Sequence, residues 1–199
     1  MKIVCLDLEG VLVPEFWIEF SNATKIPELS LTTRDVPDYD ELMKMRMRIL
    51  REHKIGIEKI HAVVKEMKPF PGALRFIKWL RERAQPVVIT GSYYEYIQPL
   101  IAQIGYPFTI ANTLEIAPNG EVVGYRLREA DGKVEMINRF RDAGYSTIAI
   151  GDSFNDLGML KGADHGIVFK GSEKLLEQEK ALPHAETYAE LKKILERLL

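Results

Sequence analysis

Val4-Cys5-Leu6-Asp7-Leu8-Glu9-Gly10-Val11 is the stretch that decides which fold we expect. The apolar run from Ile3 to Leu6 begins with a β-branched residue, which is typical of a short buried strand. Two carboxylates and a glycine follow it directly. Ligands of open parallel sheets bind at the carboxyl ends of the strands, so Asp7 is expected at a site of chemistry. The alternative is that Asp7 and Glu9 only begin a loop and cap a helix.

Size and composition limit the class of protein. The chain has 199 residues, 46% hydrophobic, and a formal net charge of −2. The length and hydrophobic content are enough for one core domain with a modest insertion. The small net charge gives no indication of electrostatic binding to nucleic acid or anionic membranes. Cys5 is the single cysteine, so no intrachain disulfide can form. No apolar run reaches the ~18 residues of a membrane span, and the early strand leaves no room for a signal peptide. We expect a soluble, cytoplasmic protein.

Helical patterns fill the segment after the first strand. Apolar residues recur there at three- and four-residue spacing, and Pro27, Pro37 and Gly56 divide the segment. We expect three or four short helices packed as a small bundle. Residues 15–69 are therefore predicted to form a helical cap over the carboxyl edge of the sheet. Residues 1–14 and 70–199 would form a discontinuous catalytic core.

Strands and helices alternate from residue 70 onward, which predicts an α/β fold with a doubly wound parallel sheet. Ala117-Pro118-Asn119-Gly120 is a hairpin turn signal between strands at 114–116 and 122–127. Residues 182–184 form a doubtful edge segment. The other expected strands are 86–90, 108–112, 147–150 and 167–169, and the expected helices are 73–83, 95–104, 133–143, 154–162 and 188–198.

A second acidic cluster, Gly151-Asp152-Ser153-Phe154-Asn155-Asp156, follows the strand at 147–150. A helix cap would explain Asp152 or Ser153 alone but not Asp152, Asn155 and Asp156 together. Acids from two strand tips repel strongly unless a cation lies among them. Oxygen ligands favour a hard ion, and magnesium is the natural candidate.

Two further elements have chemistry suited to phosphate. Thr90 ends a third strand and is followed by Gly91 and Ser92, so a hydroxyl and backbone N–H groups could hold phosphate oxygens there. A helix N-cap is the alternative for this segment. Lys133 begins a helix and could neutralise phosphate charge, although a lone lysine is more often a solvated surface residue.

These four elements in this order resemble the haloacid dehalogenase-like superfamily of phosphatases over essentially the whole chain. Within it, CLDLEGVLVPE, the helical segment and GDSFND are similar to phosphoserine phosphatases. Glu9 and the stretch TTRDVPDYDELM are most similar to the bifunctional phosphoserine phosphatase/homoserine phosphotransferase type. The resemblance implies a Rossmann-like core and a magnesium-dependent enzyme of serine biosynthesis. It would hydrolyse L-phosphoserine to L-serine and phosphate through an aspartyl-phosphate.

The resemblance also implies roles for the acidic residues. Asp7 would be the nucleophile, and Glu9 would first donate and then accept a proton. Magnesium would be held by the carboxylates of Asp7 and Asp152 and the main-chain carbonyl of Glu9. Asp156 would orient a metal-bound water.

Substrate contacts are implied in the same way. Glu15 would bind the ammonium group of phosphoserine and Arg48 its carboxylate, because arginine can grip a carboxylate with two parallel hydrogen bonds. Arg46, Arg48 and Arg51 share one helical stretch, so a surface role for Arg48 is the alternative. The phosphoryl group would be held by Thr90, Gly91 and Lys133, and Asn155 would hold phosphate or a neighbouring side chain.

One segment departs from the dual-function type. Those enzymes carry Ser-Asp-Thr where this chain has Thr90-Gly91-Ser92, whereas ordinary phosphoserine phosphatases carry Ser-Gly-Gly. The missing carboxylate at Gly91 weighs against transfer to homoserine more than against hydrolysis.

Several alternatives stay open. They are transfer of the phosphoryl group to homoserine, hydrolysis of another small phosphate ester, and a non-catalytic sensor or binding module on the same fold. A dehalogenase would not need the GDSxND acids. We expect a small phosphate ester as partner, with homoserine as an alternative acceptor, and no nucleic acid or membrane. Both a monomer and a homodimer fit the sequence.

Overall fold

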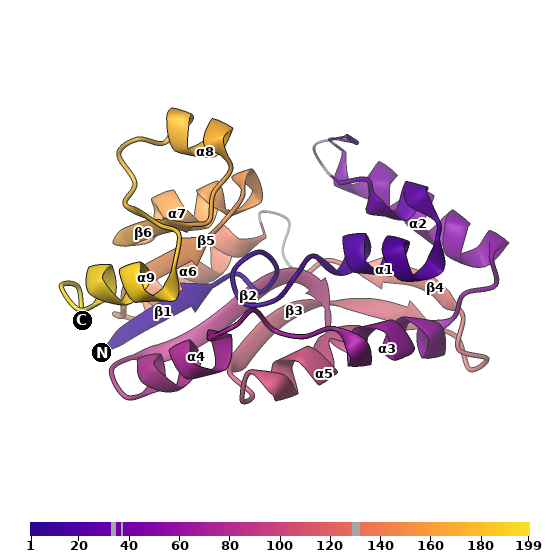
Figure 1. Cartoon of the computed structure of the whole chain (residues 1–199), viewed down its shortest axis with the longest axis horizontal. Coiled ribbons are helices and arrows are strands. Elements are labelled where there is room, and N and C mark those ends of the chain that lie inside the picture. The colour runs from indigo at the N-terminus through magenta and orange to yellow at the C-terminus, as the bar shows by residue number, and fades with distance from the viewer. Residues whose placement is uncertain (33–34, 37, 129–131) are drawn as a thin grey trace.

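The computed structural model describes residues 1–32, 35–36, 38–128 and 132–199, so the expected break at Pro37 and part of the TTRDVPDYDELM stretch lie outside it. The described residues contain a seven-stranded sheet of order β4-β3-β2-β1-β5-β6-β7 (Figure 1). Its strands are β1 (Lys2–Leu6), β2 (Gln85–Tyr93), β3 (Phe108–Ile116), β4 (Val122–Arg126), β5 (Ser146–Gly151), β6 (His165–Phe169) and β7 (His184–Ala185).

The central position of β1 follows from its sequence, since Val4, Cys5 and Leu6 are fully buried. It pairs in parallel with β2 on one side and with β5 on the other. A strand enclosed on both faces and both edges must be apolar, as this one is from Ile3 to Leu6. The prediction of a parallel sheet is confirmed for every neighbouring pair except β3 and β4, which are antiparallel.

Alternate residues of the strands face two hydrophobic layers. Val4 and Leu6 belong to the layer that contains Phe76 and Ile97, while Cys5 packs with Ile137 on the other side. The sheet is therefore covered on both faces, as predicted. The helices of the first layer are α4 (Ala73–Arg81), α5 (Tyr94–Gln103) and α9 (Tyr188–Leu195), and those of the second are α6 (Lys133–Asp142), α7 (Leu157–Gly162) and α8 (Glu173–Gln178).

Three details of the sequence interpretation need correction. The strands expected at 108–112 and 114–116 are one continuous strand, β3. Its first half pairs with β2 and its second half with β4, so a single strand serves two partners. Helix α8 was not predicted, because its six residues are too short to display a helical period. The doubtful edge segment forms β7, which begins at His184 and pairs with β6.

The segment between β1 and α4 is helical where the structure describes it. Its elements are α1 (Phe16–Thr24), the short 3-10 helix η1 (Pro27–Ser30), α2 (Tyr39–Glu52) and α3 (Ile57–Glu66). They are not a self-contained bundle, because α2 contacts β4 and α3 contacts α5. Figure 1 shows α1, α2 and α3 gathered with β4 at one end of the molecule. The division into a cap at 15–69 and a core stays a prediction.

The hairpin of β3 and β4 joins this helical end through several contacts. The backbone N–H of Ile57 donates to the Gly120 carbonyl at 2.9 Å, and Arg51 pairs with Glu121 at 3.4 Å. The Tyr125 hydroxyl donates to the Asp40 carboxylate at the start of α2. The hairpin is thus bonded to both ends of α2 and to the start of α3. Among the described helices, none combines the length and apolar character that crossing a membrane requires.

Candidate active site

Asp7 follows β1 at the carboxyl edge of the sheet, and its side chain is held by two donors. Its Oδ1 accepts the backbone N–H of Leu8 at 2.7 Å and the Nζ of Lys133 at 2.7 Å. Its own N–H continues the β1–β5 ladder by donating to the Ile150 carbonyl at 2.9 Å. Both donors bind the same oxygen of the Asp7 carboxylate, Oδ1. The other oxygen, Oδ2, is therefore available to a ligand.

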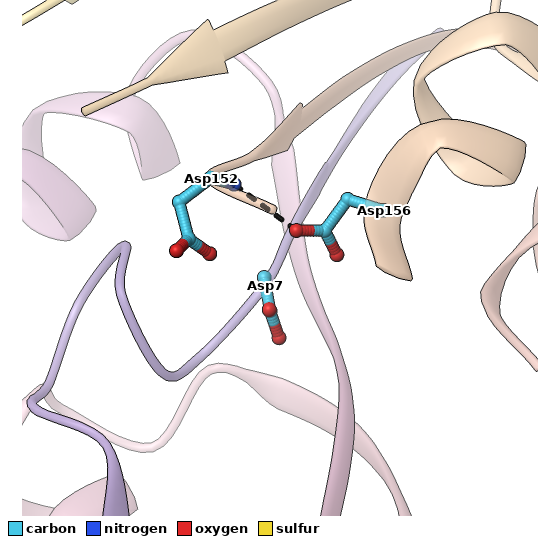
Figure 2. A group of neighbouring side chains, drawn as sticks. All are labelled: Asp7, Asp152 and Asp156. Atoms are coloured by element: carbon cyan, nitrogen blue, oxygen red, sulfur yellow. Dashed lines mark hydrogen bonds between the residues drawn. The ribbon is translucent and has the colours of Figure 1, made fainter. Parts of the chain in front are cut away.

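Two acids from the tip of β5 lie beside Asp7. One carboxylate oxygen from each of Asp7, Asp152 and Asp156 lies within 4.8 Å of the other two. Figure 2 shows the three side chains gathered at one place. Burial, followed by the charge of Asp156, raises the pKa of Asp7 well above its usual range. Burial and the charges of Asp156 and Glu15 raise the pKa of Asp152 to about 7. Mutual repulsion of this kind is relieved by a cation, so these oxygen donors fit a hard divalent ion.

Asp156 is fully buried and has protein donors for both of its oxygens. Oδ1 accepts from Lys133 at 2.7 Å, while Oδ2 accepts the N–H groups of Asp152 at 3.0 Å and Ser153 at 3.1 Å. The Ser153 hydroxyl adds a further bond to Oδ2 at 3.1 Å. A Cβ at Gly151 would collide with the Asp156 side chain, so glycine is needed there. These contacts suit Asp156 to orienting its neighbours.

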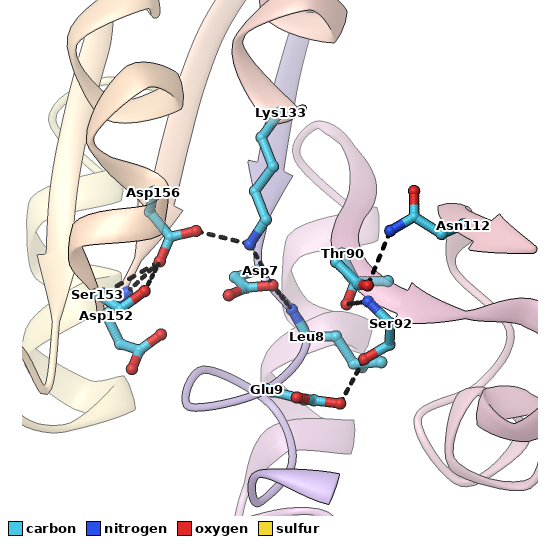
Figure 3. A network of polar contacts seen from close by, with 11 residues as sticks. Asp7, Leu8, Glu9, Thr90, Ser92, Asn112, Lys133, Asp152, Ser153 and Asp156 are labelled. Carbon is cyan, nitrogen blue, oxygen red and sulfur yellow. Dashed lines mark hydrogen bonds and ion pairs between the residues drawn. The ribbon is translucent and has the colours of Figure 1, made fainter. Parts of the chain in front are cut away.

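Lys133 reaches the acids from the first turn of α6, between Asp156 and Asp7 (Figure 3). Its side chain is only 12% exposed. Burial opposes its charge, but the carboxylates of Asp156 and Asp7 outweigh burial and raise the pKa of Lys133 above its usual value. The structure therefore brings this lysine to the acids as a permanent positive charge and does not leave it on the solvated surface.

The segment from Thr90 to Ser92 lies where the pairing of β2 becomes irregular. The register between β2 and β3 shifts between Ile89 and Tyr93. The Thr90 Oγ1 accepts the N–H of Ser92 at 3.1 Å, so the Thr90 hydroxyl can still donate to a ligand. Gly91 is exposed, and a Cβ added there would meet no atom within 4 Å. This turn can present a hydroxyl and backbone groups beside Asp7 (Figure 3).

Glu9 lies across from this turn, and the Ser92 hydroxyl donates to its Oε1. Burial, and then the nearby charge of Glu15, raises the pKa of Glu9 well above its usual range, although the bond from Ser92 acts against this shift. A carboxyl with a raised pKa can carry a proton near neutral pH. Glu15 is the residue before α1, and it is close enough to interact with both Glu9 and Asp152.

The structure does not bring Arg48 to this group. The Arg48 side chain is 69% exposed, and its Nε faces Glu52 at 3.9 Å. It lines a surface cavity of about 610 Å³ between α2 and β4. Residues two apart lie on different sides of a helix, and Arg46 occupies the inner side of α2. Arg46 is 5% exposed and its charge interacts with Glu9.

The Arg46 guanidinium is only partly satisfied by the protein. Its Nη2 donates to the Leu31 carbonyl at 2.7 Å, and its Cζ lies 4.3 Å from the centre of the Trp17 ring. Its Nε is buried without a hydrogen-bond partner among the described residues. Buried polar groups are normally bonded, so this N–H suits an anionic ligand. The spacing of arginines on α2 could have pointed to Arg46, but only with the phase of the helix known.

Asn155 is placed differently from the other expected phosphate contacts. It lies in the short 3-10 helix η2 (Phe154–Asp156), and it is exposed. The structure thus gathers Asp7, Glu9, Glu15, Asp152 and Asp156 with Thr90, Gly91 and Lys133 at one sheet edge. Arg46 and Ser92 join them, and the sequence had given neither a role of its own.

Comparisons with known proteins place the chain among similar molecules. A family model described as haloacid dehalogenase-like hydrolase matches residues 1–164. Phosphoserine phosphatase ThrH of Pseudomonas aeruginosa is 47% identical over 193 residues, covering 97% of this chain and 94% of its own. A phosphoserine phosphatase of Pseudomonas syringae pv. tomato is 46% identical, covering 97% of this chain and 81% of its own. A crystal structure of phosphoserine phosphatase in apo form has the same fold, with a TM-score of 0.78, 24% identity and 98% coverage of each chain.

Proposed function

Since the chain belongs to the haloacid dehalogenase-like hydrolase family, we propose that it is a magnesium-dependent phosphoserine phosphatase. It hydrolyses L-phosphoserine to L-serine and phosphate through an aspartyl-phosphate. The observation that carries this proposal is the placement of Asp7, whose Oδ1 is held by Leu8 and Lys133 and whose Oδ2 has no hydrogen-bond partner among the described residues. The printed names of the two relatives at 46–47% identity support the substrate.

Asp7 acts as the nucleophile in the first step. Its Oδ2 attacks phosphorus in line with the serine oxygen, so that the Oδ2–P bond forms as the P–O bond to serine breaks. Glu9 gives its proton to the departing serine oxygen. In the second step Glu9 takes a proton from water, the water oxygen attacks phosphorus, and phosphate leaves with Asp7 restored.

The transferring phosphoryl group needs positive charge and hydrogen-bond donors around it. Lys133 supplies the charge, and the Thr90 hydroxyl and Gly91 backbone supply donors. Asn155, beside Asp156 in η2, is a further contact for the phosphoryl group. Magnesium would be held by the Asp7 and Asp152 carboxylates and the Glu9 carbonyl, and when bound it neutralises negative charge on Asp7 and on phosphate. Asp156 keeps Asp152 and Lys133 in place.

Selection of the amino acid is assigned to α1 and α2. Glu15 faces the ammonium group of phosphoserine. We assign its carboxylate to Arg46 and not to Arg48, because the Arg46 Nε is buried, unpartnered among the described residues and electrostatically coupled to Glu9. An arginine in this state can donate to a carboxylate without first giving up a protein partner at that nitrogen.

The test is phosphate release by the purified protein. With magnesium and L-phosphoserine, the wild type should release phosphate, and Asp7→Asn should lower kcat by roughly 10⁴-fold or more. Circular dichroism should show that the variant stays folded. A wild type that ignores phosphoserine and hydrolyses another phosphate ester well would defeat the substrate assignment and keep the nucleophile.

Transfer to homoserine is the second candidate. Its support is Glu9 in the proton-transfer position and the similarity of TTRDVPDYDELM to the dual-function type. Homoserine added to the reaction should then yield phosphohomoserine at the expense of free phosphate, which ³¹P NMR separates. Free phosphate alone at saturating homoserine would remove this candidate.

Two wider assignments belong to the same proposal. Residues 15–69 act as a cap over the site, supported by the contacts of α2 with β4 and of α3 with α5. A cytoplasmic location is supported by the single cysteine, Cys5, which is buried in β1.

A further inference from the structure

Ser92 is a buried hydroxyl that the proposed reaction does not use. It is 4% exposed and lies near the end of β2. Its Oγ donates to Oε1 of Glu9, a residue 83 positions earlier in the chain (Figure 3). Thus Lys133 and Leu8 hold the proposed nucleophile, whereas a serine from a different strand holds the proposed proton donor.

The position of Ser92 is itself fixed from both sides of its turn. The Ser92 N–H donates to Thr90 Oγ1 at 3.1 Å. The Gly91 carbonyl accepts Nδ2 of Asn112, on β3, at 2.8 Å. These bonds tie the turn to its own strand and to the neighbouring strand. The hydroxyl is therefore presented from a rigid part of the sheet.

The direction of the bond to Glu9 follows from the two groups that it joins. A hydroxyl can donate a proton and a carboxylate oxygen can accept one, so the Ser92 hydroxyl donates to Oε1 of Glu9. A proton carried by Glu9 is then left on Oε2.

Glutamate needs such an anchor more than aspartate does. Its side chain has one more rotatable bond, so ordering a free glutamate side chain costs more conformational entropy. Glu15 lies close to Glu9, and its negative charge disfavours the ionised form of Glu9. A hydrogen bond from a fixed donor holds Oε1 at one place, so Oε2 stays directed toward the substrate.

We propose that Ser92 is a positioning residue that aims the Glu9 carboxyl at the leaving oxygen of the phosphate ester. This inference rests on the proposed function. Ser92 acts through Glu9, and it neither touches the phosphoryl group nor takes part in bond making. The proton passes from Glu9 Oε2 to the leaving oxygen as the P–O bond breaks.

A substrate pair with different leaving groups isolates this role. An alkoxide such as that of serine needs a proton as it leaves, whereas the phenolate of p-nitrophenyl phosphate leaves without one. For each substrate, kcat/KM covers only the steps up to phosphorylation of Asp7. Ser92→Ala should lower kcat/KM about tenfold for phosphoserine, the size of one lost hydrogen bond to a charged group, and less than about twofold for p-nitrophenyl phosphate.

Two further variants make the test specific. Ser92→Thr keeps the hydroxyl and should restore phosphoserine hydrolysis to within about twofold of wild type. In a Glu9→Gln background, Ser92→Ala should add almost no further loss, because residues that act as one unit are not additive. If Ser92→Ala lowers the thermal midpoint sharply, Ser92→Cys keeps the size of the side chain with a weaker donor and serves in its place.

Each outcome decides for or against the proposal. Equal losses on the two substrates, or full additivity with Glu9→Gln, would show that Ser92 only shapes the phosphate turn. No loss on phosphoserine would also overturn the proposal. If the wild type rejects phosphoserine but hydrolyses another alkyl phosphate, the substrate assignment fails, and the same comparison with that alkyl phosphate still decides the role of Ser92.

Discussion

The acids at the strand tips and the inner side of α2 hold their charges in different ways. At the strand tips, Asp156 has donors for both oxygens, and Lys133 pairs with both Asp156 and Asp7 at 2.7 Å. On α2, the buried Nε of Arg46 has no partner among the described residues. The polar contacts of the first region are largely satisfied within the protein. The second is left incomplete, and a ligand completes it. Reaction chemistry and substrate selection are thus separated in the molecule.

The largest effect is expected from a substitution in the strand-tip region. Lys133→Ala should lower kcat by about 10²–10³-fold, because it removes the charge that stabilises the transferring phosphoryl group. It should also lower the thermal midpoint, since two buried carboxylates lose their cation. Lys161→Ala is the matched control: Lys161 forms an exposed pair with Glu179, so both readouts should stay near wild type. A Lys133 variant with normal kcat would refute its role.

The next largest effect distinguishes the inner side of α2, which carries Arg46, from its solvated side, which carries Arg48. Arg46→Ala should raise KM for phosphoserine about 10–100-fold, the loss of a charged hydrogen-bonded contact. Arg48→Ala should leave KM unchanged, because Arg48 is solvated. p-Nitrophenyl phosphate has no carboxylate, so Arg46→Ala should leave its kcat/KM close to wild type. Steady-state kinetics of both variants on both substrates decides which arginine binds the carboxylate of phosphoserine. A raised KM in Arg48→Ala with an unchanged KM in Arg46→Ala would assign the carboxylate to Arg48.

A smaller effect tests how closely the β1 loop approaches the acids. Gly10 has φ +75°, and a Cβ there would collide with the Asp152 carboxylate. Gly10→Ala should therefore weaken magnesium activation several-fold, beyond the roughly 1 kcal/mol that alanine loses in a left-handed conformation. Gly144 has φ +82° with nothing within 4 Å, so Gly144→Ala reports the backbone effect alone. Titration of activity with magnesium compares the two, and equal midpoints would contradict the collision.

The smallest effect is the pH dependence of stability. The pKa of Asp152 is raised from 3.8 to about 7 in the metal-free fold, so the folded chain binds its proton more tightly than the unfolded chain. Asp152 therefore weakens the metal-free fold as pH rises from about 4 to about 7. Magnesium needs the ionised carboxylate, so it should raise the thermal midpoint by about 5 °C at pH 8 and by much less at pH 5.5. Asp152→Asn should remove this difference in scanning fluorimetry.

The strand-tip region could be predicted from the sequence because strand ends fix it. Asp7 and Asp152 each follow an apolar strand directly, and neighbouring parallel strands end at the same edge. The order of the motifs along the chain was therefore enough to bring these side chains together. The prediction of Lys133 as a site residue also required the resemblance to a known family, since one lysine at a helix start carries little information by itself.

The α2 side could not be predicted in the same way. Arg46 and Arg48 differ by two residues, and only the rotation of the helix against β4 decides which of them points inward. That rotation depends on Tyr125, Asp40 and other contacts between segments distant in sequence. The contact of Ser92 could not be predicted for a related reason, because its partner Glu9 lies in the loop after β1, 83 positions earlier in the chain. Helix α8 was missed because it is too short to show a period.

The course of β3 determines how the site can open. This strand runs without a break from its parallel pairing with β2 into its antiparallel pairing with β4. The hairpin is thus a rigid extension of the sheet, and swinging it away would twist a central layer of the protein. We therefore expect substrate to enter through movement of α1, α2 and α3, which join the sheet through the loops at 7–15 and 67–72. We expect an open form in which the Tyr125–Asp40 contact is broken while the hairpin stays where it is.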